Sequence, residues 1–346
     1  MALAYTYIRR NEIRSALFVV LFALSLLSFT YFAVYGFFVL KGVLAYFRPT
    51  GFLTFHSTLA YAFSRSLDIC RWLFPFCIAV SIFWARLAIK EGAEFILARV
   101  RGVQPLLKFE AYDAYTVLEN LCVRTGDIVP RLYVLQDSSM NAFSVGAVPK
   151  DAAIVLSSGL LEKLSRVQLE GVLAHELAHI RNLDVRLMTI LVTCLAFFTF
   201  VGEYFFYGTE KDAIYEQSRI DFREISRPMG PLAYIGLMLM VYGYLVAPLI
   251  RLGLSRTRES LADAQAALTT RYPRGLASAL WKISGDCQLE TLENSTLLGV
   301  LCIVSPFSDK PSLFNRLSGL TRSHPPVEER IRALNDMDGM FSDFSS

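Results

Sequence analysis

Four long apolar stretches limit what this chain can fold into. The first, Ser15–Leu40, contains no charged residue, and a helix of that length is sufficient to cross the hydrocarbon core of a bilayer. Hydrophobic residues make up 54% of the chain, charged residues make up 19%, and the mean hydropathy is +0.41. Such values are typical of membrane proteins. We therefore predict about four transmembrane helices, at Ser15–Leu40, Leu73–Ile89, Leu187–Gly208 and Pro231–Ile250.

Basic residues predict the orientation of these helices. Arg9, Arg10 and Arg14 precede the first stretch, which is longer than the core of a signal peptide, so we interpret it as an uncleaved anchor. With four spans, most other basic residues near the span ends lie on the same side as these three, and the positive-inside rule makes that side cytosolic. Both termini are therefore expected in the cytosol. The first loop, 41–72, is expected to hold an interfacial helix at Phe52–Leu67, and we assign its His56 no metal role.

The remaining composition argues against two other classes of protein. The net charge is only +3 and no basic run is interleaved with aromatic residues, so we do not expect nucleic-acid binding. The six cysteines have neither metal-ligand nor disulfide spacing. They are expected to be buried free thiols in a protein that faces a reducing compartment. The sequence carries no signature of a particular oligomeric state.

The segment between the second and third spans predicts a small α+β unit. Lys108–Arg124 has apolar residues at helical spacing, and three short β-type runs follow it. These runs are Arg131–Gln136, Asn141–Val145 and Ala153–Leu156. An edge strand of such a sheet can pair with an extended peptide, and Asn141, Ala142 and Phe143 are our candidates for that substrate-binding edge. The alternative is an ordinary hairpin with no substrate role.

An H-E-x-x-H pattern follows this unit, in the run His175-Glu176-Leu177-Ala178-His179. Residues four apart on an α-helix share one face, so both imidazoles can bind a single ion, and two neutral imidazoles suit Zn²⁺. Glu176 is offset around the helix axis and can act as a general base without being a ligand. The pattern predicts a zinc peptidase site. The alternative is a surface helix that carries these residues by chance.

Two segments near the C-terminus offer further site residues. Glu259 and Asp263 are four apart on a predicted helix, so Glu259 can be the third zinc ligand and Asp263 can accept a hydrogen bond from a ligand histidine. The alternative is an exposed acidic helix face. Further on, His324 lies in a His-Pro-Pro loop and can donate to an oxyanion, while Arg330 on the following helix can brace the site. The alternative there is a surface histidine and a helix salt bridge.

Four segments in a fixed order carry a resemblance to a known family. They are Asn141-Ala142-Phe143, Leu173–Asp184, Ser255–Ala267 and Ser323–Leu334. The chain resembles the HtpX-like membrane zinc metalloproteases, which are relatives of the CaaX prenyl protease. The resemblance covers roughly residues 85–340 and implies a mainly α-helical membrane protein with a zincin-type α+β catalytic domain that carries a small β-sheet.

The resemblance also implies a role for each site residue. His175, His179 and Glu259 become the ligands of one zinc ion per chain, and Glu176 becomes the general base. Asp263 and Asp184 become supporting residues behind the ligands. His324 and Arg330 are placed in the catalytic site. Cleavage of a peptide bond by a zinc-activated water then needs no cysteine or serine nucleophile.

We expect four regions in the chain: an N-terminal membrane region at 1–92, a catalytic part at 93–186, two further spans at 187–254, and a C-terminal helical part at 255–346. The implied function is quality control and stress response by an endopeptidase of a bacterial cytoplasmic membrane. Its substrates would be misfolded or unassembled membrane proteins, cut at the cytosolic face just above the lipid bilayer. Two alternatives stay open: a narrow processing protease of the prenyl-protease type, and a non-proteolytic membrane scaffold.

Overall fold

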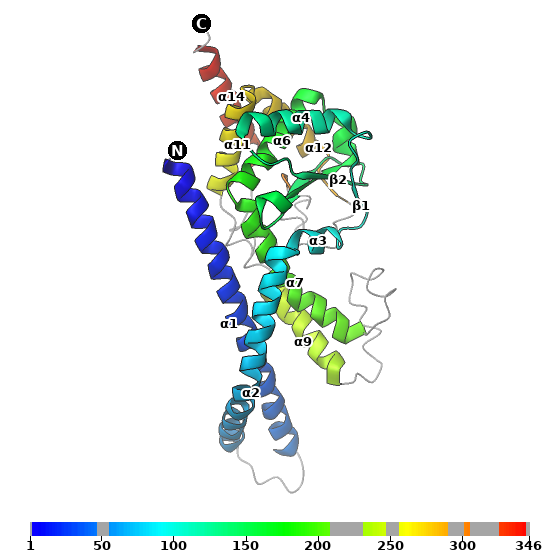
Figure 1. Ribbon diagram of the computed structural model, residues 1–346. Helices are drawn as coiled ribbons and strands as arrows, with labels where there is room; N and C mark the ends of the chain where they lie inside the picture. The colour runs from blue at the N-terminus through cyan, green and yellow to red at the C-terminus, as the bar shows by residue number, and fades with distance from the viewer. Residues whose placement is uncertain are drawn as a thin grey trace.

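The computed structural model describes residues 2–46, 55–207, 231–246, 256–289, 301–304 and 325–343. Figure 1 shows a membrane part made of long helices and a head that lies at one end of it. The membrane part consists of α1 (Ala2–Tyr46), α2 (Phe55–Lys90), α7 (Asp184–Tyr207) and α9 (Pro231–Val246). The other elements form the head: α3 (Gly92–Leu97), β1 (Val103–Pro105), α4 (Tyr112–Thr125), β2 (Arg131–Leu135), β3 (Ala142–Val145), the 3₁₀ turn η1 (Pro149–Asp151), β4 (Ala153–Ser157), α5 (Ser158–Lys163), α6 (Arg166–Arg181), α11 (Arg256–Thr270), α12 (Pro273–Gly285) and α14 (Val327–Asp343).

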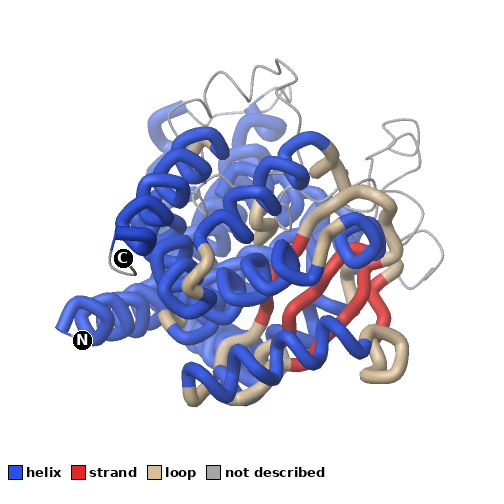
Figure 2. The backbone as a smooth tube through the Cα atoms, turned by 90° about the horizontal axis from the view of Figure 1, so that it is seen from above, coloured by secondary structure: helices blue, strands red, loops and turns tan. Residues whose placement is uncertain are grey.

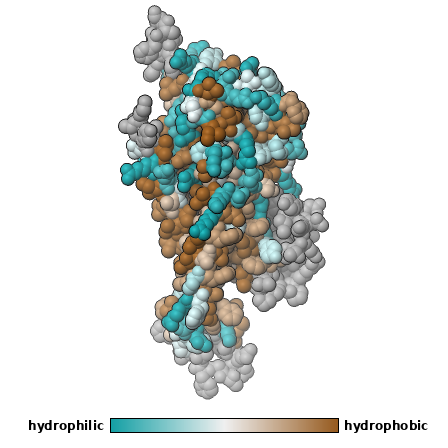
Figure 3. All heavy atoms as spheres, viewed as in Figure 1, coloured by the Kyte–Doolittle hydropathy of each residue, from teal (hydrophilic) through white to brown (hydrophobic). Residues whose placement is uncertain are grey.

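Three of the four predicted membrane spans are confirmed as helices of sufficient length. Among the described residues, the apolar helical stretches long enough to cross a bilayer are Thr6–Leu44, Ser57–Lys90 and Asp184–Phe206. The fourth prediction falls on α9, whose 16 described residues are fewer than the roughly 20 that a span needs; positions 247–250 lie outside the described residues. Figure 3 shows hydrophobic residues over the membrane part and more hydrophilic ones over the head.

The prediction of a long first loop was wrong. Helix α1 continues to Tyr46 and α2 already begins at Phe55, so positions 55–67 of the expected interfacial helix are the first part of one continuous helix, while positions 52–54 lie outside the described residues. Polar residues misled the hydropathy pattern, because Arg65 and Asp68 lie on the exposed surface of α2 and face each other 3.9 Å apart. Pro75 lies inside α2, where a membrane helix can accommodate it.

The head is built around a four-stranded mixed sheet in the order β1-β2-β4-β3. Strand β2 pairs with β1 in the antiparallel sense and with β4 in the parallel sense, and β3 pairs antiparallel with β4. The three strands predicted from the sequence are confirmed, and β1 is an additional one. Strand β3 lies at the end of the sheet, which makes it an edge strand.

Alternation along the strands gives the sheet two apolar faces. Leu132, Ile154 and Leu156 pack into a core with α4, α6 and the C-terminal helices. Val155 and Phe143 point the other way, into a second core with α3 and α7. Figure 2 shows helices on both sides of the strands. The sheet therefore joins the head to a membrane helix, since α7 belongs to both parts.

Local sequence fixes both ends of α6. At its start, Ser165 and Gln168 form a capping box, in which Ser165 Oγ accepts from the Gln168 N–H and Gln168 Oε1 accepts from the Ser165 N–H. At its end, Leu183 has a φ of 58°, a left-handed conformation that costs energy for a residue with a side chain. Helix α7 begins one residue later, so α6 and α7 meet in a tight elbow, residues 182–184.

Candidate metal centre

Three side chains from two helices converge in the head. His175 and His179 lie one turn apart on α6, and their Nε2 atoms are 3.1 Å apart. Glu259, from the first turn of α11, places its carboxylate oxygens 3.8 Å from His175 Nε2 and 3.6 Å from His179 Nε2. This is the one group of metal-ligand type among the described residues. The sequence-predicted ligand set is therefore brought together.

The spacing and charge of this group fit a zinc ion. Tetrahedral bonds of about 2.0–2.1 Å place ligand atoms roughly 3.3 Å from one another, close to the separations found here. The surroundings are also acidic. The carboxylates of Glu176, Glu259, Asp184 and Asp263 are all buried, and the buried cationic groups among the described residues are the guanidinium groups of Arg258 and Arg330. A divalent cation would balance this excess of negative charge.

Each histidine is backed by a carboxylate at its other ring nitrogen. His175 Nδ1 lies 3.0 Å from Asp263 Oδ1, and His179 Nδ1 lies 3.0 Å from Asp184 Oδ2. A carboxylate in this position favours the tautomer whose Nε2 lone pair would face a bound metal ion. Burial disfavours the protonated ring of His179, but the carboxylates of Glu259 and Asp184 outweigh burial and raise its pKa to about 9. The pocket thus attracts positive charge.

Arg330, from α14, holds Asp263 in place. Its Nε and Nη2 each donate to one carboxylate oxygen of Asp263 at 2.8 Å, and its Nη1 donates to the Ile303 carbonyl at 3.0 Å. Burial would raise the pKa of Asp263, but the Arg330 guanidinium outweighs burial and holds that pKa well below its usual range. Arg330 thus lies beside the predicted site, behind the predicted ligand His175.

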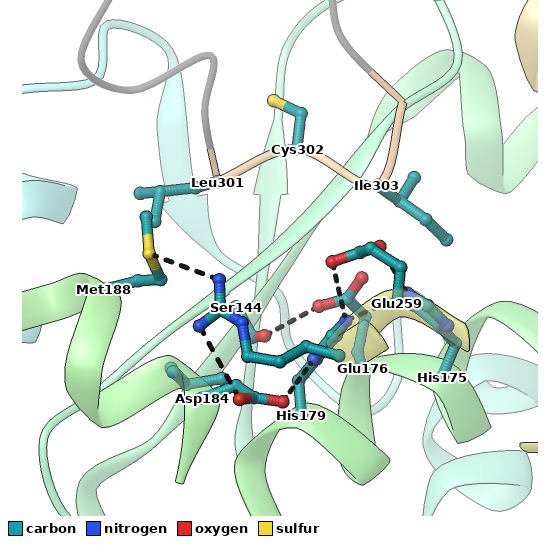
Figure 4. A pocket seen from close by; sticks show the side chains of 12 residues that line it. Ser144, His175, Glu176, His179, Asp184, Met188, Glu259, Leu301, Cys302 and Ile303 are labelled. Carbon is teal, nitrogen blue, oxygen red and sulfur yellow. Dashed lines mark hydrogen bonds and ion pairs between the residues drawn. The ribbon is translucent and has the colours of Figure 1, made fainter. Parts of the chain in front are cut away.

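The carboxylate of Glu176 is held by a hydrogen bond from a strand residue rather than from its own helix. Ser144 lies on β3, on the sheet face toward α6, and its Oγ donates to Glu176 Oε2 at 2.6 Å. Both side chains are buried at the wall of one pocket, beside the histidines and Glu259 (Figure 4). The residues that line this pocket are Ser144, His175, Glu176, His179, Asp184, Val185, Met188, Arg258, Glu259, Leu301, Cys302 and Ile303.

The edge strand β3 borders the pocket, but its first residues are already engaged. Asn141 Nδ2 donates to the carbonyls of Cys287 and Val304, and the Ala142 carbonyl accepts from the Ile303 N–H at 2.9 Å. The Asn141 carbonyl accepts from Ser157 on the β4 side. Backbone groups alternate along a strand, so those of Phe143 also face β4, whereas those of Ser144 face the open side.

The structure places most of the predicted site residues together and adds two. His324 lies outside the described residues. Sequence reasoning missed Ser144, although strand alternation two residues after Ala142 could have indicated it. It also missed Arg258, which is 3% exposed and has its Nη1 3.6 Å from Asp184 Oδ1. Nothing in the sequence around Arg258, which directly precedes Glu259, predicts that its side chain is buried.

Known proteins resemble this chain over most of its length. A protease HtpX homolog from Dictyoglomus thermophilum is 36% identical over 74% of this chain and 79% of its own length. The homolog from Bacteroides fragilis is 34% identical over 94% of this chain and 96% of its own. A crystal structure of Ste24p from S. mikatae is 24% identical and covers 75% of this chain and 58% of its own, with a TM-score of 0.41.

The match to a family covers the whole site. Residues 118–338 match the model of peptidase family M48, and this range includes the H-E-x-x-H helix, Glu259 and Arg330. The apolar helices α1, α2 and α7 add the membrane part. The chain therefore belongs to peptidase family M48, as an HtpX-like membrane metalloprotease.

Proposed function

We propose that this protein hydrolyses peptide bonds with one zinc ion held by His175, His179 and Glu259. The observation that carries the proposal is the convergence of two Nε2 atoms and one carboxylate beside the buried Glu176. A bound zinc ion would lower the pKa of a water molecule and polarise the carbonyl group of a substrate. The chain's own residues then supply the binding, the orientation and the proton transfers.

Glu176 is the general base and acid of this proposal. Its carboxylate takes a proton from the attacking water and later gives it to the leaving amine of the cleaved peptide bond. Ser144 fixes one carboxylate oxygen, Oε2, so that Oε1 is the oxygen that exchanges the proton. Asp263 and Asp184 hold the two imidazoles, and Arg330 holds Asp263. His324 is proposed to donate to the oxyanion.

An extended peptide is proposed to bind along β3. Asn141, Ala142 and Phe143 begin this edge, and the backbone N–H and C=O of Ser144 face its open side, next to Glu176. A peptide that pairs there continues the sheet where the contact with Ile303 ends. This register would hold the peptide backbone beside the metal ligands. Because the contacts are main-chain hydrogen bonds, they favour unfolded segments of varied sequence.

The proposed substrates are misfolded or unassembled membrane proteins, cut at the cytosolic face of a bacterial cytoplasmic membrane. Two features support this proposal: the metal site lies at the start of the membrane helix α7, and the basic residues near the span ends favour a cytosolic head. A protease whose active site lies close to the membrane surface can bind chains that emerge from the bilayer.

The test compares zinc content and cleavage in detergent-purified full-length protein. Wild type is expected to hold about one zinc per chain and to cut casein in a chelator-sensitive way. Glu259→Ala is expected to lose most of its zinc. Glu176→Gln should keep the zinc but lose at least roughly 10²-fold in cleavage rate, since it removes the general base. Equal zinc in wild type and Glu259→Ala would refute the ligand set, and full cleavage by Glu176→Gln would refute the mechanism.

A further inference from the structure

The first membrane helix reaches the metal site through one buried side chain. Asn11 lies in the N-terminal turns of α1, which run beside the head (Figure 1), and it is 1% exposed. Its Nδ2 donates to the Asn182 carbonyl at 2.9 Å and to Asp184 Oδ1 at 2.8 Å. Both acceptors belong to the elbow between α6 and α7. The helix and the elbow are more than 170 residues apart in sequence.

The same carboxylate supports a proposed metal ligand. Asp184 Oδ2 lies 3.0 Å from His179 Nδ1, while Oδ1 accepts from Asn11. The two oxygens therefore link α1 to His179 in one short chain of contacts. Asp184 Oδ1 has a second neighbour, since Arg258 Nη1 lies 3.6 Å away. The Asn11 amide keeps the carboxylate oriented with Oδ2 toward His179, and without the amide the carboxylate is free to turn toward the guanidinium.

The elbow itself needs support from outside. Leu183 holds a left-handed φ of 58° at its centre. The Asn182 side chain exchanges two hydrogen bonds with Gln265 of α11, at 2.9 and 3.2 Å. The Asn182 carbonyl is the group that Asn11 binds. The elbow is therefore hydrogen-bonded both to α1 and to α11, the helix that carries Glu259.

We propose that Asn11 is a positioning residue of the metal site, and that α1 is part of that site as well as a membrane anchor. The proposal rests on the proposed role of His179 as a zinc ligand. Loss of the Asn11 amide lets the Asp184 carboxylate rotate, so His179 loses its fixed tautomer and orientation. Removal of such outer partners typically weakens metal binding by about 10- to 100-fold for the direct partner. For Asn11, one step further out, we expect roughly 3- to 10-fold.

The test is zinc affinity in full-length protein, measured by competition with a chromogenic zinc chelator. Asn11→Ala removes the amide, and Asn11→Leu also removes it but keeps the side-chain volume, in case the smaller residue destabilises the fold. Ser15→Ala is the matched control, because Ser15 lies one turn further along α1, is 2% exposed, and donates only to the Asn11 carbonyl of its own helix. Both Asn11 variants should bind zinc more weakly than wild type while they still fold, as judged by a cooperative melting transition. Their kcat should fall while KM is unchanged, and the control should match wild type within about twofold.

A double-mutant cycle separates positioning from general structural support. If Asn11 acts through Asp184, then Asn11→Ala adds no further loss of zinc affinity in an Asp184→Ala background. Additive losses, or wild-type zinc affinity in both Asn11 variants, would overturn the inference. Wild-type protein that binds no zinc would instead refute the proposed function, so the two failures are distinguishable.

Discussion

At the scale of single residues, the contact between Ser144 and Glu176 allows a test of the proton transfer that does not disturb zinc binding. Hydrogen bonds to a charged group contribute about 1.5–3 kcal/mol, and Ser144 makes one to a buried carboxylate that is not a ligand. Ser144→Ala should therefore lower kcat by about tenfold or more and leave zinc content unchanged. The measurement is steady-state cleavage of a fluorogenic peptide beside elemental analysis. Ser144→Thr keeps the hydroxyl and should retain most of the activity, and equal kcat in wild type and Ser144→Ala would contradict the role.

The cysteines provide a second prediction at this scale. The six side chains are free thiols, and burial raises the pKa of Cys122 to about 11. Cys302 lines the pocket, but Figure 4 shows its sulfur turned away from the histidines, so it is not aimed at the reacting groups. An alkylating reagent needs the thiolate. Iodoacetamide at pH 7.5 should therefore leave cleavage intact, whereas a zinc chelator should abolish it, and inhibition by alkylation would contradict this assignment.

The sign of the pH effect at Cys122 follows from its raised pKa. The folded value of about 11 exceeds the reference value of 9.0, so the buried neutral thiol stabilises the fold below pH 9. This contribution is lost as the pH rises from about 9 through about 11. Mass-spectrometric labelling should show Cys122 protected in folded protein at pH 8, less protected near pH 11, and modified at both after unfolding. Equal labelling of folded and unfolded protein at pH 8 would contradict its burial.

At the scale of elements, α7 and α9 pack closely because both carry glycine at their crossing. A Cβ placed at Gly202 would lie 2.6 Å from Met240 Cγ and 2.8 Å from the Gly236 carbonyl oxygen. Gly202→Leu should therefore force the helices apart and lower the melting temperature in detergent, at a cost of about 1–3 kcal/mol. The matched control is Gly36→Leu on α1, where a Cβ would meet nothing within 4 Å. Equal melting temperatures for both variants would contradict this close packing.

The elements also show what the sequence could predict. The helix α6 and its ligand spacing follow from local pattern, as do the three longer strands. Strand β1 was missed because its three residues are too short to show alternation. Helices α1 and α2 are longer than the apolar stretches within them, so the hydropathy pattern underestimated the length of both helices. The contacts of Ser144 with Glu176 and of Asn11 with Asp184 join distant segments, and such pairs leave no periodic signal in a single sequence.

At the scale of the whole molecule, the candidate metal site lies close to the ends of the candidate membrane helices. The candidate spans begin at Thr6, end at Lys90 and begin again at Asp184, and the side chain of Asp184 contacts the proposed ligand His179. Between α6 and α7 the chain passes through the elbow alone, so the histidines of α6 stay close to the start of α7. We therefore expect the pocket to open near the edge of the bilayer, and we predict cleavage near the point where a substrate leaves the membrane.

The distance between the pocket and the bilayer can be measured with a membrane-anchored substrate. The reporter has one transmembrane helix followed by a long unstructured segment on the side of the head, reconstituted with the protease in vesicles. An extended chain spans at most about 3.3–3.6 Å per residue, so a site within roughly 10–25 Å of the bilayer should cut about three to eight residues beyond the helix. Mass spectrometry of the released fragment locates the cut, and Glu176→Gln protease serves as the control. If cuts are spread evenly along the segment, or cluster far from the helix, the site does not lie at the membrane surface and the substrate reaches it from solution.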